Sequence, residues 1–573
     1  MRRSSAWIIF FITLGIFAVL LLYPLWSVIG GGFFTLDGAF TFEYLAGVFR
    51  NPIYRQGLFN SAMIAVCTTS LVTLIAVPLA WLTNRFDFWG KSLISGLLLV
   101  PMILPPFVGA IGFQQIFGQY GSLNSLMGWG EIDWLGFARF WGVVILQALS
   151  LYPIMYLNVA AAMANVDPAM EQAAENLGCS GFAKFRKITL PLIMPGLFAG
   201  GAIVFIWSFT ELGTPLIMNY TRCTPVQVFD QLKEISTSPL SFALVFVMLA
   251  VSVLLYSITK LLFGRQAYAM QAKAVVGATT TKVLGLKNLL VLLPFVAVIF
   301  VAILPHIGVV LTSISPPGGW YRTVLPTEYS SANYVEALGH VMTVSSIKNS
   351  LLYASLAVMF NVVLGIMIAF VIVRSDIKVR GLLDALAMLP LAVPGMVMAF
   401  GYIAVSQQLT NTTIFGFGGK ESPLWRSLFD VQTNPTLFLV IAYSIRRLPY
   451  MVRSAVAGLQ QTSVTLEEAA RNLGASSLTT VRRVTVPLIL ANLIAGAMLA
   501  FAFSMLEVSD SLMLAQRTDF YPITKTIYEL FQLIGTGKYV ASALGVWAMV
   551  FLAVTILGSS LILGKKLGAI FRV

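Results

Sequence analysis

Long apolar stretches constrain the fold of this chain more than any other feature of its sequence. About 20 apolar residues in a helix span the hydrocarbon core of a bilayer. Twelve stretches approach that length, at residues 7–29, 59–83, 93–118, 142–162, 193–217, 239–263, 288–313, 348–373, 383–408, 436–457, 489–515 and 541–563. Charged residues make up 10% of the chain, too few to cover a water-facing surface, since soluble domains carry about 25%. We therefore predict an all-α polytopic membrane protein with about twelve transmembrane helices, and exclude a soluble enzyme, a disulfide scaffold and a disordered chain.

The distribution of charge predicts the orientation of these helices. The chain carries a net charge of +13. Lys and Arg concentrate in the loops that are cytoplasmic when the N-terminus is inside, as the positive-inside rule requires. The first stretch follows Met1-Arg2-Arg3, but its apolar run is too long for a signal peptide, so we expect a retained helix. Both termini are predicted to be cytoplasmic, and the basic balance does not indicate a nucleic-acid partner.

The sequence repeats itself over its whole length. Five features recur 289 residues apart and four recur 296 apart. The pairs are Asn60-Ser61 with Asn349-Ser350, Arg85 with Arg374, Pro101 with Pro390, Pro105 with Pro394 and Gly112 with Gly401, then Pro153 with Pro449, Gly178 with Gly474, Pro191 with Pro487 and Glu211 with Glu507. Seven additional residues around 409–435 account for the change of offset.

The repeat divides the chain into two halves of about six helices each. We predict a first repeat at 1–263, a cytoplasmic linker at 264–287 with Arg265, Lys273, Lys282 and Lys287, and a second repeat at 288–573. Because six is an even number, both repeats start on the same side of the membrane. They are expected to be parallel, related by a pseudo-twofold axis along the membrane normal, with a substrate pathway between them.

A long polar loop joins the fourth and fifth helices of each half, at 167–191 and 463–487. Asp167 is suited to cap a helix that begins at Pro168. Thr465 and Glu468 have the spacing of a capping box. Gly178 and Gly474 stand where a helix ends in a left-handed residue. Each loop is therefore predicted to form a helix, a turn and a second helix.

These loops resemble the EAA loop of permease subunits of binding-protein-dependent ABC importers. That pattern reads E-A-A, three residues, G, nine residues, then I-x-L-P. The second loop matches it with Glu468-Ala469-Ala470, Gly474 and Val484-Thr-Val-Pro487, whereas the first has Gln172 in place of the Glu, with Glu171 before it. The resemblance implies coupling helices that dock on ATPase subunits, through Glu171, Gln172, Ala173, Ala174 and Gly178 and through Glu467, Glu468, Ala469, Ala470 and Gly474.

The resemblance implies a transmembrane subunit of an importer in a bacterial inner membrane. Its expected partners are two copies of an ABC ATPase, an external substrate-binding protein and the lipid bilayer. A phosphate loop needs G-x-x-x-x-G-K-[ST]. Gly90-Lys91-Ser92 lacks the first glycine, whose place Arg85 takes. We therefore expect no enzymatic activity and no cofactor in this chain, with ATP and magnesium bound by the partner subunits.

Ionisable residues inside the apolar stretches are candidates for the pathway, because they are costly in a membrane. Glu211, Glu507 and Asp510 are expected to line it and favour a cation, with the two later acids on one helix face. The alternative is that they lie at the outer interface or hold helices together. Arg446 and Arg447 suit an anionic substrate or a partner acid if they are deep, but we favour a pair that snorkels to the cytoplasmic surface.

Among such permeases the chain most resembles the ferric-iron branch. The supporting features are the run Glu-Leu-Gly-Thr-Pro at 211–215, the run Arg-Arg-Leu-Pro-Tyr at 446–450, and the overall length. Thiamine, aminoalkylphosphonate and sugar phosphate stay open as substrates. Ferric iron prefers oxygen ligands, so metal-binding residues cannot be read from the scattered His and Cys. A twelve-helix secondary transporter is a distant alternative, and a membrane enzyme is disfavoured because no catalytic constellation occurs.

Overall fold

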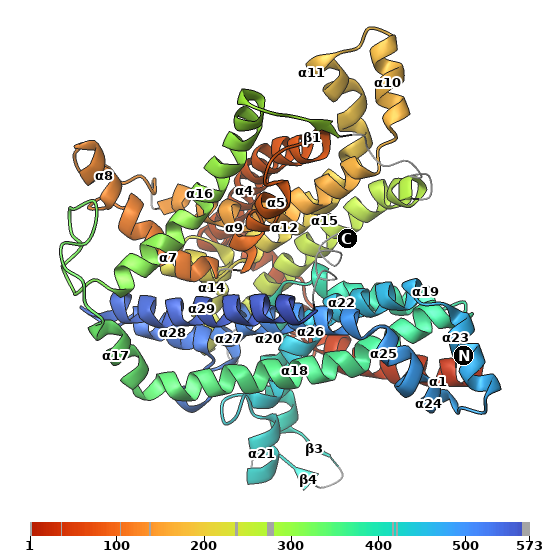
Figure 1. Ribbon diagram of the computed structural model, residues 1–573. Coiled ribbons are helices and arrows are strands. Elements are labelled where there is room, and N and C mark those ends of the chain that lie inside the picture. The colour runs from red at the N-terminus through yellow and green to blue at the C-terminus, as the bar shows by residue number, and fades with distance from the viewer. Residues whose placement is uncertain are drawn as a thin grey trace.

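Nearly all of the chain is helical in the computed structural model (Figure 1). The structure describes residues 3–35, 37–103, 105–136, 139–234, 239–271, 280–414, 417–419 and 422–563. Two short two-stranded ladders complete it, with β1 (Phe86–Asp87) parallel to β2 (Thr281–Lys282) and β3 (Thr413–Ile414) antiparallel to β4 (Phe417–Gly418).

The helices of the two halves follow one another in matching order. The first half contains α1 (Arg3–Phe17), the π-turn η1 (Ala18–Leu22), α2 (Tyr23–Phe33), α3 (Glu43–Arg50), α4 (Pro52–Arg85), α5 (Lys91–Leu97), α6 (Val100–Ile103), α7 (Pro106–Phe117), α8 (Ser122–Met127), α9 (Phe140–Ala164), α10 (Pro168–Asn176), α11 (Gly181–Lys184), the π-turn η3 (Phe185–Thr189), α12 (Leu190–Thr210), α13 (Gly213–Ile217), α14 (Thr224–Asp230), the 3₁₀ turn η4 (Gln231–Glu234) and α15 (Pro239–Gln271). The second contains α16 (Leu286–Ser313), α17 (Ala332–Gly339), α18 (Val341–Arg374), α19 (Arg380–Ala392), α20 (Gly395–Asn411), α21 (Pro423–Phe429), α22 (Thr436–Gln461), α23 (Val464–Asn472), α24 (Ser477–Thr480), the π-turn η5 (Val481–Thr485), α25 (Val486–Leu488), α26 (Leu490–Met505), α27 (Ser509–Leu514), the 3₁₀ turn η6 (Thr518–Phe520), α28 (Ile523–Phe531) and α29 (Gly537–Leu563).

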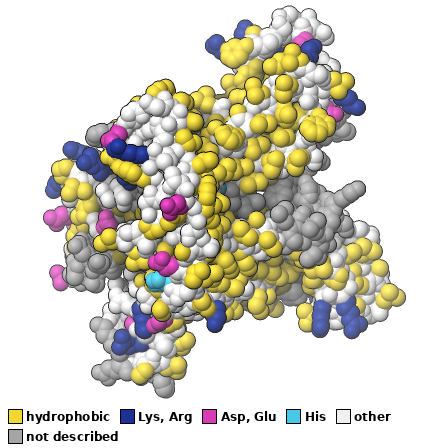
Figure 2. Space-filling view, turned by 60° about the vertical axis from the view of Figure 1, so that its left-hand side comes forward, with side chains coloured by type: hydrophobic (Ala, Val, Ile, Leu, Met, Phe, Trp, Pro, Cys, Tyr) yellow, Lys and Arg dark blue, Asp and Glu magenta, His cyan; other side chains and the backbone are white. Residues whose placement is uncertain are grey.

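The predicted all-α polytopic membrane fold is confirmed. Among the described residues, eight helices are long and apolar enough to cross a membrane, and the number is up to eleven if each of three bent pairs is one span. Two of the bends lie in the third predicted stretch of each half. The first, of 93°, lies between the helices that end at Met102 and begin at Pro106, and the second, of 101°, between those that end at Ala392 and begin at Gly395. The remaining predicted stretch lies on α22, whose arginines make it less apolar. Figure 2 shows a broad apolar face with charged side chains gathered toward its edges.

Equivalent residues make equivalent contacts in the two halves, as the sequence repeat predicts. Ser61 Oγ accepts a hydrogen bond from the Thr224 amide at 2.9 Å, and Ser350 Oγ accepts one from the Ile523 amide at 2.7 Å. The neighbouring side chains, Asn60 and Asn349, each donate to a backbone carbonyl of the same loop region. The repeat is therefore structural as well as sequential. The exact boundaries 1–263 and 288–573 stay a prediction.

The first membrane helix of each half packs on the other half. Helix α16 lies along α7, which Figure 1 shows as a green helix beside orange ones, and α2 lies along α20. Gly112 and Gly401 make these crossings close. A Cβ at Gly401 would lie 2.7 Å from the Pro24 carbonyl oxygen, and one at Gly112 would overlap the Pro305 carbonyl oxygen.

Two helical hairpins, α10–α11 and α23–α24, project from the body and define what we call the loop end of the molecule (Figure 1). The opposite end, which carries α8, α14, α17 and α28, is called the far end. Residues 272–279 of the predicted linker, including Lys273, lie outside the described residues. The part that follows returns along the loop end of the first half, because β2 pairs with β1.

Candidate functional site

A cavity of about 170 Å³ lies between the two halves, where their broken helices meet. Five proline and glycine residues at or beside these breaks line it: Pro101, Pro106, Pro390, Pro394 and Gly395. The bend in each half begins at a proline that precedes a helix, Pro105 before α7 and Pro394 before α20. A proline lacks an amide hydrogen and disfavours helical geometry in the residue before it, so these sequences end one helix and start another.

Glu211 lies on the first-half side of the cavity, in the break between α12 and α13. Its carboxylate accepts the Thr214 amide at 2.9 Å and so caps the short helix α13. The Gln147 side-chain amide lies 3.4 Å away, and Gln147 in turn accepts from Ser208 at 2.5 Å. These partners are uncharged, so they orient the carboxylate without neutralising it.

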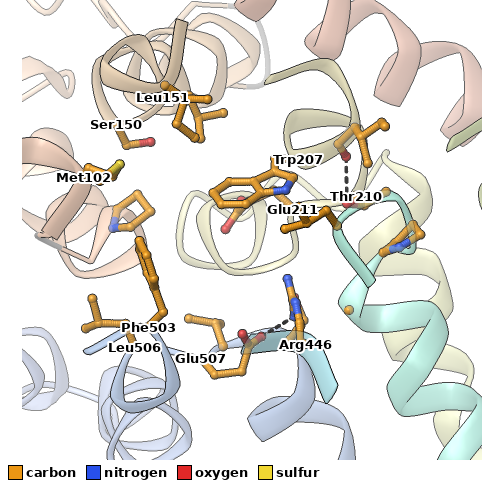
Figure 3. A pocket seen from close by; sticks show the side chains of 18 of the residues that line it. Met102, Ser150, Leu151, Trp207, Thr210, Glu211, Arg446, Phe503, Leu506 and Glu507 are labelled. Atoms are coloured by element: carbon orange, nitrogen blue, oxygen red, sulfur yellow. Dashed lines mark hydrogen bonds and ion pairs between the residues drawn. The ribbon is translucent and has the colours of Figure 1, made fainter. Parts of the chain in front are cut away.

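Glu507 lies across the cavity, in the equivalent break between α26 and α27, and it is neutralised (Figure 3). Arg446 NH1 is 2.5 Å from Glu507 Oε1 and 3.4 Å from Asp510 Oδ2. Arg447 pairs with the other oxygen of Glu507 and donates to the Phe503 carbonyl at 3.1 Å. Gly395 leaves the space for this arrangement, because a Cβ there would overlap the Arg446 guanidinium.

The two sides of the cavity therefore differ in charge although their backbones correspond. With the offset of 296, Arg446 and Arg447 stand where the first half has Ser150 and Leu151, and Asp510 stands where it has Thr214. Two arginines and two carboxylates cancel on the second-half side. On the first-half side, Glu211 has no ion-pair partner among the described residues, only the uncharged donors Thr214 and Gln147.

Two expectations about these residues are wrong. Arg446 and Arg447 do not snorkel: both point into the cluster with Glu507, and Arg447 is buried within α22. Glu507 and Asp510 do not share a helix face, because α26 ends at Met505 and Asp510 belongs to α27. Asp510 is fully buried behind Arg446, and of the three predicted acids only Glu211 and Glu507 line the cavity.

The predicted helix–turn–helix of the first loop is present as α10 and α11. Asp167 caps α10 by accepting the Ala169 amide at 2.9 Å, and Gly178 follows with φ of +82°. Glu171 points back to the body, where its carboxylate pairs with Arg85 at 3.0 Å and accepts from Thr189 at 2.8 Å. Of the other predicted residues in this loop, Gln172 and Ala173 are exposed to solvent, whereas Ala174 is buried.

The second loop has the same form, with one correction. Gly474 has φ of +87°, as predicted. Ser463, and not Thr465, caps α23 by accepting the Thr465 amide at 3.3 Å, because the helix begins one residue before Thr465. Glu467 pairs with Arg374 at 3.0 Å, and both side chains are buried. Glu468 and Ala469 are exposed, and Ala470 is half-buried.

Charges at equivalent places anchor the two loops differently. Arg374 also donates to the Leu459 and Thr462 carbonyls at the end of α22. In the first half, Lys184 and Glu175 join Arg85 and Glu171 in a partly exposed network. At the offset of 296, Glu175 is equivalent to Arg471 and Lys184 is equivalent to Thr480. The ammonium of Lys184 hydrogen-bonds to Glu175 and lowers the pKa of that carboxyl below its ordinary value.

Several cavity residues were missed in the sequence. Gln147, Trp207, Tyr450 and Phe503 line the cavity, but uncharged and aromatic side chains do not stand out in apolar stretches. At the offset of 296, Gln147 is equivalent to Tyr443. A polar side chain at both equivalent positions of two apolar stretches is the signal that could have found Gln147. No group of three or more His, Cys, Asp or Glu that could hold a metal ion occurs in the described part of the chain.

Two parallel halves, a cavity at their interface and two projecting hairpins define a polytopic membrane transport subunit. Comparison with family models gives the particular family: the model described as binding-protein-dependent transport system inner membrane component matches residues 72–268 and 361–564. The chain belongs to this family, with one copy of the domain in each half.

Some relatives match most of this chain, and others match only about a quarter of it. The ferric transport system permease protein FbpB of Actinobacillus pleuropneumoniae is 26% identical over 80% of this chain, which spans 64% of that relative's length. The Fe(3+)-transport system permease protein FbpB 2 of Haemophilus influenzae is 24% identical over 81% of this chain and 82% of its own. The molybdenum transport system permease protein ModB of Haemophilus influenzae is 34% identical over 27% of this chain and 70% of its own.

Proposed function

We propose that this chain forms the translocation pathway of an ABC importer for ferric iron. An external binding protein delivers the iron at the far end, and ATPase subunits bind the loop end on the cytoplasmic side. Both termini are then cytoplasmic. The observation that carries the proposal is the carboxylate of Glu211 in the cavity between the halves, which has no ion-pair partner among the described residues.

Matching apolar side chains on the two hairpins support two docked ATPases. Leu177 and Leu473 are 88% and 90% exposed at the turns. The offset of 296 also pairs Met170 with Leu466 and Phe182 with Leu478, all of them exposed. Exposed apolar groups in equivalent positions suit two copies of one partner, because each copy would bury the same surface. We propose one ATPase subunit on each hairpin.

The charge of the cavity supports a cation as cargo. Glu211 has no ion-pair partner among the described residues, whereas the arginines opposite it pair with Glu507 and Asp510. A free carboxylate in a partly dehydrated site attracts a cation strongly. Ferric iron prefers oxygen donors of this kind. The paired arginines give correspondingly little support to an anionic cargo.

Uptake by proteoliposomes tests the proposal. Liposomes carry this chain and its ATPase, with the binding protein outside and ATP inside, and radiolabelled ferric iron is offered. We expect ATP-dependent iron uptake that falls at least tenfold in Glu211→Gln. Asp384→Asn serves as the matched control, because Asp384 pairs with Arg453 outside the cavity.

Different outcomes separate the parts of the proposal. ATP-dependent uptake of molybdate, thiamine or a phosphonate without iron would retain the importer and overturn the cargo. Equal loss of uptake in Glu211→Gln and Asp384→Asn would remove the special role of Glu211. Uptake that survives without ATP would contradict the importer itself.

A further inference from the structure

A second cavity, of about 530 Å³, lies between the two halves at the far end of the molecule. The first half contributes the end of α7 and parts of the segment that joins α7 to α9. The second half contributes Trp320, Tyr321 and the turn between α28 and α29. This cavity shares none of its described lining residues with the cavity that contains Glu211, so it is a separate site.

Two basic side chains line this far-end cavity, one from each half. Arg139 of the first half donates through one guanidinium nitrogen to the Met218 carbonyl at 3.1 Å. Lys538 of the second half donates to the side-chain oxygen of Gln115 at 3.1 Å. Neither cation has an ion-pair partner among the described residues. Most of their N–H groups are therefore left for a bound ligand.

The carboxylates near these cations are engaged elsewhere. Asp133 lines the cavity, but it is exposed, and its Oδ1 accepts the Leu135 amide at 3.1 Å. Glu131, close by in the sequence, pairs with Arg322. Two cations against one carboxylate leave the lining with a net positive charge, which favours an anion in the cavity.

Hydrogen bonds place both cations near one turn of α7. Gln114 donates to the carbonyl of Ile217 at 2.6 Å, and Arg139 holds the next carbonyl along the chain. Gln115 accepts from Lys538. Arg139 and Lys538 therefore approach the same part of the cavity wall from different halves, where one small ligand can contact both.

The backbone of Arg139 also indicates a role for its side chain. Arg139 precedes α9 with φ of +66°, a left-handed conformation that residues with a Cβ rarely adopt and that glycine adopts freely. At the offset of 296 the equivalent residue is Pro435, so the fold of the repeat does not require an arginine here. Strained residues of this kind cluster at ligand-binding sites.

We propose that the far-end cavity binds a small divalent oxyanion, such as a dicarboxylate, between Arg139 and Lys538. A guanidinium fork binds two oxygens of such a group, and the ammonium adds a point charge. Because the two cations belong to different halves, the bound anion holds the halves together at the far end. It stabilises the arrangement in which they meet and slows any transport step that separates them there. This site is distinct from the proposed iron pathway and does not depend on its cargo.

Binding of succinate tests this site without iron. The chain and its ATPase, in nanodiscs without ATP or binding protein, are titrated with sodium succinate by isothermal titration calorimetry at constant ionic strength. Succinate is preferred to phosphate as the probe, because the ATPase subunits bind phosphate groups at their own nucleotide sites. We expect succinate to bind at least tenfold more tightly than acetate, whose single charge neutralises only one of the two cations. Arg139→Gly and Lys538→Met should each weaken succinate binding at least tenfold.

Three variants separate loss of the site from loss of the fold. Arg139→Gly removes the guanidinium but relieves the positive φ, so it should remain folded by thermal denaturation and still lose succinate binding. Lys538→Arg keeps the charge and should keep the binding. Arg517→Gln is the matched control, because Arg517 pairs with Asp519 outside this cavity and its loss should leave succinate binding unchanged.

The proposed anion site is ruled out if succinate and acetate bind alike, or if both variants bind succinate as tightly as wild type. It is also ruled out if Arg139→Gly and Lys538→Met weaken association with the external binding protein but not with succinate. The cavity would then accept an acidic side chain of that protein. Absence of iron uptake together with succinate binding that needs both cations would overturn the proposed cargo and support the anion site.

Discussion

Replacement of Arg374 by methionine should release the second hairpin far more than the same change at Arg85 releases the first. The Arg374 side chain is 8% exposed and pairs with a buried Glu467 while it also holds two carbonyls of α22. Removal of one partner from a buried pair costs about 3–5 kcal/mol, because it leaves an uncompensated charge. Arg85 is 35% exposed, and Lys184 still faces Glu171 and Glu175 without it. Pairs of this exposure contribute about 0–1 kcal/mol.

Hydrogen exchange measures the difference directly. In nanodiscs, amide protection in α23 should fall by a factor of about 10² or more in Arg374→Met, since 1.4 kcal/mol is tenfold. Protection in α10 should fall by less than about fivefold in Arg85→Met. Hairpins that open locally report their own free energy and not that of the whole fold. Equal loss of protection in both variants, or unchanged protection in α23, would refute the inference that burial makes the second anchor stronger.

Two further predictions concern the cavity and the first hairpin. Gly395→Ala should cost about 1–3 kcal/mol by overpacking and lower ATP-dependent uptake, because its methyl group displaces Arg446; thermal denaturation and the uptake assay measure the two effects. Lys184→Met should raise the pKa of Glu175 toward its ordinary value, with Arg85 still lowering it, and a carboxyl NMR titration should detect the shift. The lowered pKa means that the contribution of Glu175 to stability is present at neutral pH and lost as the pH falls through that lowered value. In Lys184→Met the charge of Glu175 should therefore disappear at a higher pH than in wild type.

Controls for these two predictions lie nearby. Gly381→Ala places its methyl group where no atom lies within 4 Å, so stability and uptake should be unchanged. Thr480 occupies the place of Lys184 in the second hairpin, so Thr480→Val should leave the Glu175 titration as it is. A Glu175 titration that is the same with and without Lys184 would contradict the assigned cause of the pKa shift.

Local sequence patterns predicted most of the fold. Apolar stretches located the helices, and Asp167 and the two loop glycines marked the hairpins. Each of these patterns depends on a few neighbouring residues, or on the hydropathy averaged over about 20 residues. None of them requires knowledge of contacts between distant segments. Thr465 was misjudged because Ser463 is an equally good cap two residues earlier.

Contacts between distant segments could not be predicted in this way. The pairing of Arg446 and Arg447 with Glu507 depends on how α22 packs against the break after α26, and a hydropathy window averages over both. The repeat relates residues within a half to their counterparts, but it says nothing about which of them meet at the interface. Phe229 and Lys525 are therefore unremarkable in the sequence, although the Lys525 ammonium of the second half lies over the Phe229 ring of the first.

The first membrane helix of each half packs on the other half, and this arrangement bears on how the protein is made. Until α16 has been synthesised and inserted, α7 has no partner at Gly109 and Gly112, the surface on which Pro305 and Gly308 later rest. The ribosome therefore finishes the first half of the chain well before that half can finish folding. A polypeptide released after residue 271 would present an unfilled groove to the bilayer and to membrane quality control, while a second half made alone would lack α2 in the same way. A single chain keeps the two halves together while these interfaces form, because neither half has its full set of packing partners without the other.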